Sequence, residues 1–151
     1  RDLEAAGIVR RDLLDPPASV AVYVLTDRGR ALEPVLVELG RWGRAEPIVT
    51  GNDLSVDAFA LALKTTFRPM FDASYALCID AEWFTLTVHG ELIDLARGRD
   101  GRVDTTLDGD ARTLRGYAFG RISFDDAERA GLSFTGNRTL ARRFPKLFVA
   151  G

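Results

Sequence analysis

The spacing of apolar residues predicts short helices and strands in a defined order at the start of the chain. Residues 1–6 carry apolar side chains at helical spacing and precede Gly7, the residue type favoured just past a helix C-terminus. A strand is predicted at 8–14 and a β-branched strand at 20–25, with a proline-bearing turn at 15–19. These residues therefore predict the tail of a helix followed by a β-hairpin.

A helix with one apolar face is predicted after the hairpin. Thr26 stands at the N-cap position before Asp27, and Pro34 is expected to bend the helix because proline lacks a backbone N–H. Packing within its own domain is the ordinary role of such a face, but residues 1–45 offer little surface to cover it. The pattern therefore favours packing on another chain. The apolar stripe consists of Leu32, Val35, Leu36, Leu39 and Trp42.

A boundary between two units is predicted in the middle of the chain. Residues 46–53 mix glycine, proline, asparagine and charge without periodicity, which is typical of a linker. We therefore divide the chain into a first unit at 1–45 and a second unit at 54–151.

In the second unit the period of apolar residues changes from helical to two and back. Ser55 is the expected N-cap of a helix, and the alternating pattern of strands begins at Tyr75. Four strands up to residue 109 are predicted to form an antiparallel meander, with an Asp-Gly hairpin turn at 99–101. Two helices, a fifth strand and a last helix follow, and Pro145 is expected to distort the last helix. This order predicts an α+β unit.

Composition and charge exclude several classes of protein. The chain has 151 residues, 46% of them apolar, which is enough for a packed core. Its apolar runs fall far short of the ~20 residues of a membrane span, and it shows no signal segment. A single cysteine, Cys78, gives no reason to expect an oxidising compartment, so we expect a cytoplasmic protein with no membrane partner. The net charge of −2 does not indicate a nucleic-acid partner, so any prediction of DNA binding depends on local pattern and resemblance.

The titratable residues do not form a catalytic or metal-binding motif. His89 is the only histidine, and no nucleophile motif accompanies it. The acid pairs Asp80 with Glu82 and Asp125 with Asp126 stand at turns and helix starts, where acids are common. We therefore predict no enzyme activity, no metal site and no cofactor.

The first unit resembles the C-terminal part of a winged helix-turn-helix regulator of the HxlR type. The resemblance is carried by the stretch LTDRGRALEPVLVELGRWG at 25–43, which follows the pattern of that family's last helix. It implies a dimeric transcription regulator in which the apolar stripe pairs with its twin in a second copy, and in which the helix tail and the hairpin, or wing, approach DNA.

Five residues of the first unit are candidates for DNA contact on the basis of this resemblance. They lie on the helix tail, on the first wing strand and in the wing turn, where contacts to phosphates give affinity without reading sequence. For Arg10 and Arg11 the alternative is a solvated pair at a strand edge. Only the last turns of a recognition helix fall within residues 1–6, so these residues by themselves are expected not to read an operator. The candidates are Arg1, Arg10, Arg11, Pro17 and Ser19.

The second unit is similar to the sterol-carrier-protein type of lipid-binding domain, on the strength of residues 104–148. The resemblance implies a five-stranded sheet covered by helices on one face, with an apolar ligand held between them. The residues expected to line such a site could equally form an ordinary core. They are Phe59, Leu63, Phe67, Phe84, Leu86, Phe119, Phe144 and Leu147.

Taken together, the two resemblances imply a dimeric DNA-binding regulator whose C-terminal domain senses a small apolar effector. The alternative is a lipid carrier or binding protein in which the first unit serves only for dimerisation. The operator and the effector cannot be identified from the residues themselves.

Overall fold

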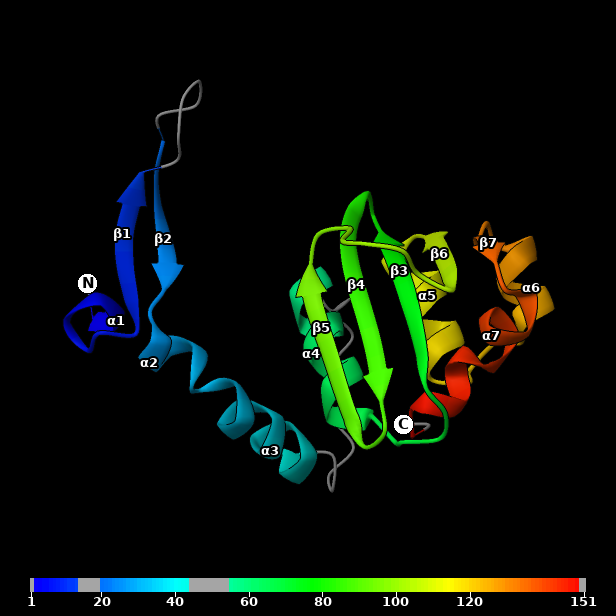
Figure 1. The fold of residues 1–151 in the computed structure, drawn as a ribbon, viewed down its shortest axis with the longest axis horizontal. Helices are drawn as coiled ribbons and strands as arrows, with labels where there is room; N and C mark the ends of the chain where they lie inside the picture. Colours follow the sequence, from blue (N-terminus) through cyan, green and yellow to red (C-terminus); the bar gives the residue numbers. More distant parts are fainter. Residues whose placement is uncertain (1, 14–19, 44–54, 150–151) are drawn as a thin grey trace. The chain divides into compact units, whose positions relative to one another are not determined.

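The computed structural model describes residues 2–13, 20–43 and 55–149 (Figure 1). The chain separates into two compact units, Arg1–Gly43 and Arg44–Gly151, and each is described by itself. The predicted linker at 46–53 lies outside the described residues.

The first unit consists of a helix end, a hairpin and a helical arm. A glycine-based cap ends the first helix: Gly7 has φ of 67°, and the Ile8 N–H donates to the Leu3 carbonyl at 2.8 Å. The chain then enters an antiparallel hairpin in which Val9 pairs with Leu25 and Leu13 with Ala21. The elements are α1 (Asp2–Ala5), β1 (Val9–Leu13), β2 (Ala21–Leu25), α2 (Asp27–Arg30) and α3 (Glu33–Gly43).

Thr26 joins the hairpin to the helical arm through one hydroxyl group. This hydroxyl donates to the Gly7 carbonyl at 2.6 Å and accepts from the Gly29 N–H at 3.1 Å, so it caps α2 and holds the end of α1. Gly29 is buried against the same turn, and a Cβ atom there would lie 2.1 Å from the Ile8 carbonyl oxygen. The conformation of this junction therefore requires glycine at 29.

The bent helix predicted from residue 27 onward is instead two helices. α2 ends at Arg30, residues 31–32 form a turn, and α3 begins at Glu33. Pro34 has no N–H to donate to the Arg30 carbonyl, so the helical ladder is interrupted at this point.

The second unit is a five-stranded mixed sheet with helices, in agreement with the α+β prediction. Its sheet has the strand order β5-β4-β3-β6-β7, in which only β3 and β6 are parallel neighbours. The elements are α4 (Val56–Thr66), β3 (Ala73–Ile79), β4 (Glu82–His89), β5 (Leu92–Arg97), β6 (Thr105–Gly109), α5 (Ala111–Ala118), α6 (Phe124–Arg129), β7 (Ser133–Gly136), α7 (Arg138–Arg143) and the 3₁₀ helix η1 (Phe144–Leu147).

The predicted meander is wrong at its last strand. β6 does not turn back along β5 at the Asp-Gly pair but lies on the far side of β3. The connecting segment 98–104, here named the crossover, is fastened to β4, because the Asp100 N–H donates to the Thr85 hydroxyl at 3.0 Å. At its other end the Asp104 carboxylate accepts from the Ser74 N–H and hydroxyl at 2.8 and 2.7 Å. These bonds hold the chain across the sheet, where the prediction had a hairpin turn.

The hydrophobic core lies between the sheet and the helices, and α4 and α5 pass behind the sheet in the view of Figure 1. Alternate residues of β3, namely Tyr75, Leu77 and Ile79, point into this core. Ala76 and Cys78 lie on the opposite face of the sheet, here named the open face.

The segment that follows α4 pairs with the segment that follows η1 beside this core. Phe67 and Phe148 form a β-bridge, the Arg68 N–H donates to the Leu147 carbonyl at 2.7 Å, and the Val149 N–H donates to the Thr66 carbonyl at 2.8 Å. α4 is thereby tied to the end of η1. Among the described residues, no helix is long and apolar enough to cross a membrane.

Candidate functional site

The hairpin places the two wing arginines on opposite faces. Arg10 forms an ion pair with Asp12 at 2.8 Å, so its charge is partly neutralised within the strand. Arg11 is exposed opposite Tyr23 and takes part in no ion pair among the residues that the structure describes. Of the two, only Arg11 thus presents a cation that is not already engaged. The other candidates for DNA contact, Arg1, Pro17 and Ser19, lie outside the described residues.

The stripe predicted for dimerisation is exposed along its whole length. Its five side chains are between 38% and 76% exposed, with Trp42 at the upper end. The polar side of α3 carries an ion pair between Arg41 and Glu38. A helix of this kind, apolar on one side and solvated on the other, lacks a covering surface within the described part of its own unit.

The eight residues predicted to line an apolar ligand site come together in the core of the second unit. Phe59 packs edge-to-face on Phe119 at 5.9 Å between ring centroids, and Phe144 packs on Phe148 at 5.1 Å. Phe67 is half-buried against the core, and the other seven are buried: Phe59, Leu63, Phe84, Leu86, Phe119, Phe144 and Leu147. Their role in holding a ligand stays a prediction.

Two buried tyrosines in this core were not singled out from the sequence. The Tyr75 hydroxyl donates to the Leu140 carbonyl at 3.1 Å, and the Tyr117 hydroxyl donates to the Ala141 carbonyl at 2.5 Å. Burial raises the pKa of both hydroxyls, so both remain neutral. They fasten α7 to the sheet and α5, which is a structural role.

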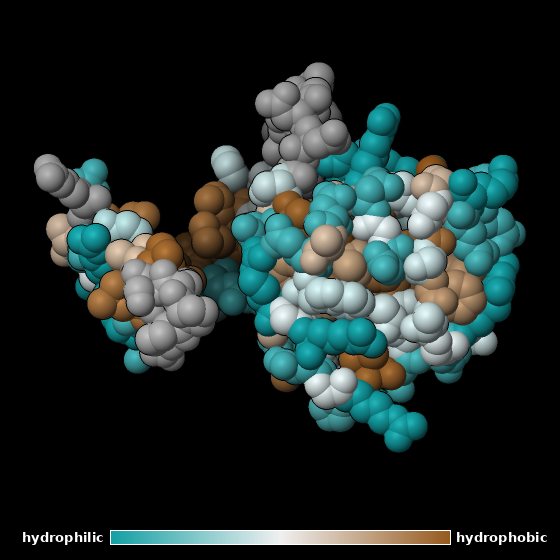
Figure 2. Space-filling model, turned by 90° about the horizontal axis from the view of Figure 1, so that it is seen from above, coloured by the Kyte–Doolittle hydropathy of each residue, from teal (hydrophilic) through white to brown (hydrophobic). Residues whose placement is uncertain are grey.

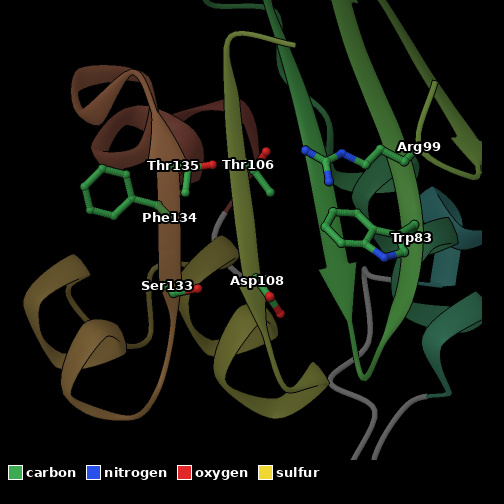
Figure 3. A pocket seen from close by; sticks show the side chains of 7 residues that line it. All are labelled: Trp83, Arg99, Thr106, Asp108, Ser133, Phe134 and Thr135. Atoms are coloured by element: carbon green, nitrogen blue, oxygen red, sulfur yellow. The ribbon is translucent and has the colours of Figure 1, made fainter. Parts of the chain in front are cut away.

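A pocket of about 230 Å³ lies on the open face of the sheet (Figure 3). Trp83 and Arg99 form one wall, with the Arg99 guanidinium 4.7 Å above the indole ring. The side chains of Thr106 and Asp108 face them from β6, whereas the ring of Phe134 points away from the pocket in Figure 3. The lining residues are Trp83, Arg99, Thr106, Asp108, Ser133, Phe134 and Thr135.

Sequence reasoning missed this pocket, because its residues come from β4, the crossover, β6 and β7. The register brings them together: Cys78 pairs with Trp83 on one side and with Asp108 on the other. Burial, and then the adjacent Asp108 carboxylate, raise the pKa of the Cys78 thiol, so this cysteine is held in its neutral form. The only local signal was the large Trp83 on the polar side of its strand.

The remaining titratable groups are dispersed. His89 is exposed at the end of β4, where its Nδ1 lies 3.2 Å from an Asp72 carboxylate oxygen. Within the described ranges, no group of three or more histidine, cysteine and acidic residues could hold a metal ion.

The first part of the chain matches a known family of regulators. The HxlR-like helix-turn-helix family matches residues 1–47. Two curated relatives from Bacillus subtilis (strain 168), the uncharacterized HTH-type transcriptional regulators YvaP and YybR, are each 40% identical over 42 and 45 residues. These stretches are 28% and 30% of this chain and 39% and 36% of the relatives, so the chain spans less than two-fifths of the proteins that it matches.

Parts of the fold have counterparts among solved structures. The sec-alkylsulfatase Pisa1 from Pseudomonas sp. matches 68% of this chain and 18% of its own, with a TM-score of 0.59 and 17% identity. Sterol Carrier Protein 2 Like 2 from Aedes aegypti matches 79% of this chain and 98% of its own, with a TM-score of 0.39 and 12% identity. At these identities the likeness concerns the fold alone. Residues 1–47 thus match the HxlR-like helix-turn-helix family, and the chain continues into an α+β unit.

Proposed function

We propose that this chain is part of a dimeric DNA-binding transcription regulator, acting in the cytoplasm, whose second unit binds a small apolar effector and has no enzymatic role. The observation that carries the proposal is the HxlR-like match over residues 1–47. The exposed stripe on α3 supports it, as does Arg11 on the hairpin, which has no ion-pair partner within the described ranges, because each suits a task that the family match implies.

Dimerisation is assigned to the apolar stripe of α3. Leu36 and Leu39 are about half exposed in the single chain, and covering them would remove apolar surface from water at about 25 cal/mol per Å². A second copy of the same helix is a matching partner, since a two-fold interface brings one surface patch against itself.

DNA contact is assigned to Arg11 on the wing. Its side chain is exposed and has no ion-pair partner within the described residues, whereas the Arg10 charge faces Asp12. A phosphate contact by Arg11 would add affinity that falls as salt increases, without adding sequence preference.

The effector is assigned to the space between the sheet and the helices, around Phe59, Leu63 and Phe144. These side chains belong to one apolar cluster, which suits a ligand without charge. Native mass spectrometry of the purified protein tests this step, and a co-purifying apolar molecule is expected. A protein that stays empty when incubated with a panel of fatty acids and sterols would refute the effector but not the DNA binding.

The decisive experiment measures DNA binding by the intact gene product at two salt concentrations. Arg11→Ala is expected to weaken binding about threefold to tenfold and to reduce the salt dependence by about one phosphate contact. Arg10→Ala is the matched control and should change binding less, because Arg10 is paired with Asp12. Absence of any salt-dependent DNA binding by the intact protein would overturn the regulator and favour the lipid carrier.

A further inference from the structure

The open face of the sheet, on the side opposite the apolar core, carries a second place where a small molecule can bind. The pocket there owes its shape to the crossover, which spans β4 and β3 and is bonded to Thr85 and Ser74. β3 carries only short side chains on this face, those of Ser74, Ala76 and Cys78. The taller Trp83 and Arg99 stand on one side of them and β6 and β7 on the other, which leaves a depression of about 230 Å³.

One wall of the pocket carries a guanidinium group that can bind an anion. The Arg99 guanidinium stacks over the Trp83 ring at 4.7 Å, and a stacked guanidinium keeps its N–H donors free in its own plane. Arg99 is exposed and has no carboxylate partner among the ion pairs of the described residues. Arg97, two residues earlier in the chain, is by contrast paired with both Glu82 and Asp57.

The opposite wall carries groups that can accept a hydrogen bond from a ligand. Asp108 is exposed at the pocket, and Thr106, Ser133 and Thr135 line the same side. Asp108 accepts a hydrogen bond from the Cys78 thiol but forms no ion pair with any residue in the described ranges, so its remaining acceptor capacity can serve a ligand. Beside these two polar groups, the Trp83 ring adds an apolar side chain to the lining of the pocket.

The size of the pocket limits the ligand. A volume of 230 Å³ corresponds to about eight water molecules at about 30 Å³ each, which suits a molecule of about ten non-hydrogen atoms. A sterol or a long fatty acid is much larger than this. We propose that the open-face pocket binds a small aromatic carboxylate bearing a hydroxyl or amino group, with the carboxylate on Arg99 and the donor group on Asp108. This site is independent of the apolar effector site and of DNA binding.

The test is direct binding of 4-hydroxybenzoate to the protein, measured by isothermal titration calorimetry. Benzoate lacks the donor and phenol lacks the carboxylate, so each is expected to bind at least about tenfold more weakly. Arg99→Gln is expected to weaken 4-hydroxybenzoate binding about tenfold or more, and Asp108→Asn to reduce the preference over benzoate. Arg102→Gln, an exposed arginine of the same crossover outside the pocket, is the matched control and should bind as the wild type does.

A second readout locates the ligand. The chain has two tryptophans, so its NMR spectrum contains two indole N–H signals, and Trp42→Phe identifies the one that belongs to Trp83. The Trp83 signal is expected to shift with 4-hydroxybenzoate while the Trp42 signal stays. No binding at millimolar ligand, an unchanged Trp83 signal, or equal affinities of the Arg99 and Arg102 variants would each overturn the site. None of these results would bear on the proposed regulator.

Discussion

The two units place their apolar side chains in opposite ways. In the second unit they form one closed core, and few large apolar residues reach the surface. In the described part of the first unit they are mostly exposed, on the hairpin as well as on α3, and only Gly29 is buried. Figure 2 shows the same contrast, because the second unit is mainly teal and white whereas brown surface is prominent on the first. The second unit is therefore stabilised from within, whereas the described part of the first unit buries little apolar surface of its own.

The strongest test of this contrast is a substitution that creates a cavity in the core of the second unit. Phe144 is fully buried against Tyr75, Tyr117 and Phe148, so Phe144→Ala is expected to lower the free energy of unfolding by about 3–5 kcal/mol. Urea denaturation followed by circular dichroism measures the change. Met70→Ala removes an exposed apolar side chain and should stay within about 0.5 kcal/mol of the wild type.

Charges on α3 test whether the exposed apolar surface has a partner. Replacing Leu36 and Leu39 together by Asp is expected to weaken dimerisation by about 3 kcal/mol, more than a hundredfold, because carboxylates would be buried between the helices. Sedimentation equilibrium measures the dimer dissociation constant. Glu38→Gln changes the polar side of the same helix and should leave it nearly unchanged. A double variant that dimerises like the wild type would contradict the assignment of the stripe.

The junction at Thr26 tests how the first unit is held together. Gly29→Ala would bring a Cβ atom against the Ile8 carbonyl oxygen, so we expect a loss of about 1–3 kcal/mol in the stability of the junction. This loss is measured as faster amide hydrogen exchange of Thr26 and Ile8 in the Gly29→Ala variant. Gly43→Ala meets no neighbouring atom and serves as the control. Similar exchange in both variants would show that the junction tolerates a side chain.

The smallest effect is expected from the acid at the end of the crossover. Hydrogen bonds from Ser74 lower the pKa of Asp104 in the folded state, so its contribution to stability is present above the unfolded pKa of about 3.9 and is lost as pH falls through the folded value. Because Asp104 is exposed, the contribution is about 1 kcal/mol or less. Asp104→Asn should lower the urea midpoint at pH 7 and make stability less dependent on pH below about 4. An unchanged pH dependence would contradict this role.

Local features of the fold were predictable, and long-range features were not. Thr26 and Ser55 were predicted as helix caps and do accept backbone N–H bonds, because a cap acts within three residues of itself. The path of the crossover depends on its hydrogen bonds to Thr85 and Ser74. Turn rules consider only neighbouring residues, so they cannot predict bonds to residues so distant in the sequence. The open-face pocket escaped notice for the same reason, since it exists only once β6 lies beside β3. Whether α3 pairs and whether the core admits a ligand stay predictions.

The bridge between Phe67 and Phe148 has a consequence for synthesis of the chain. Because the first helix of the second unit is bonded to residues 147–149, this unit completes its fold only after its last turn has left the ribosome. Strands β3 to β5 can pair earlier, but the edge of β3 that pairs with β6 then stays without a neighbouring strand until β6 is added.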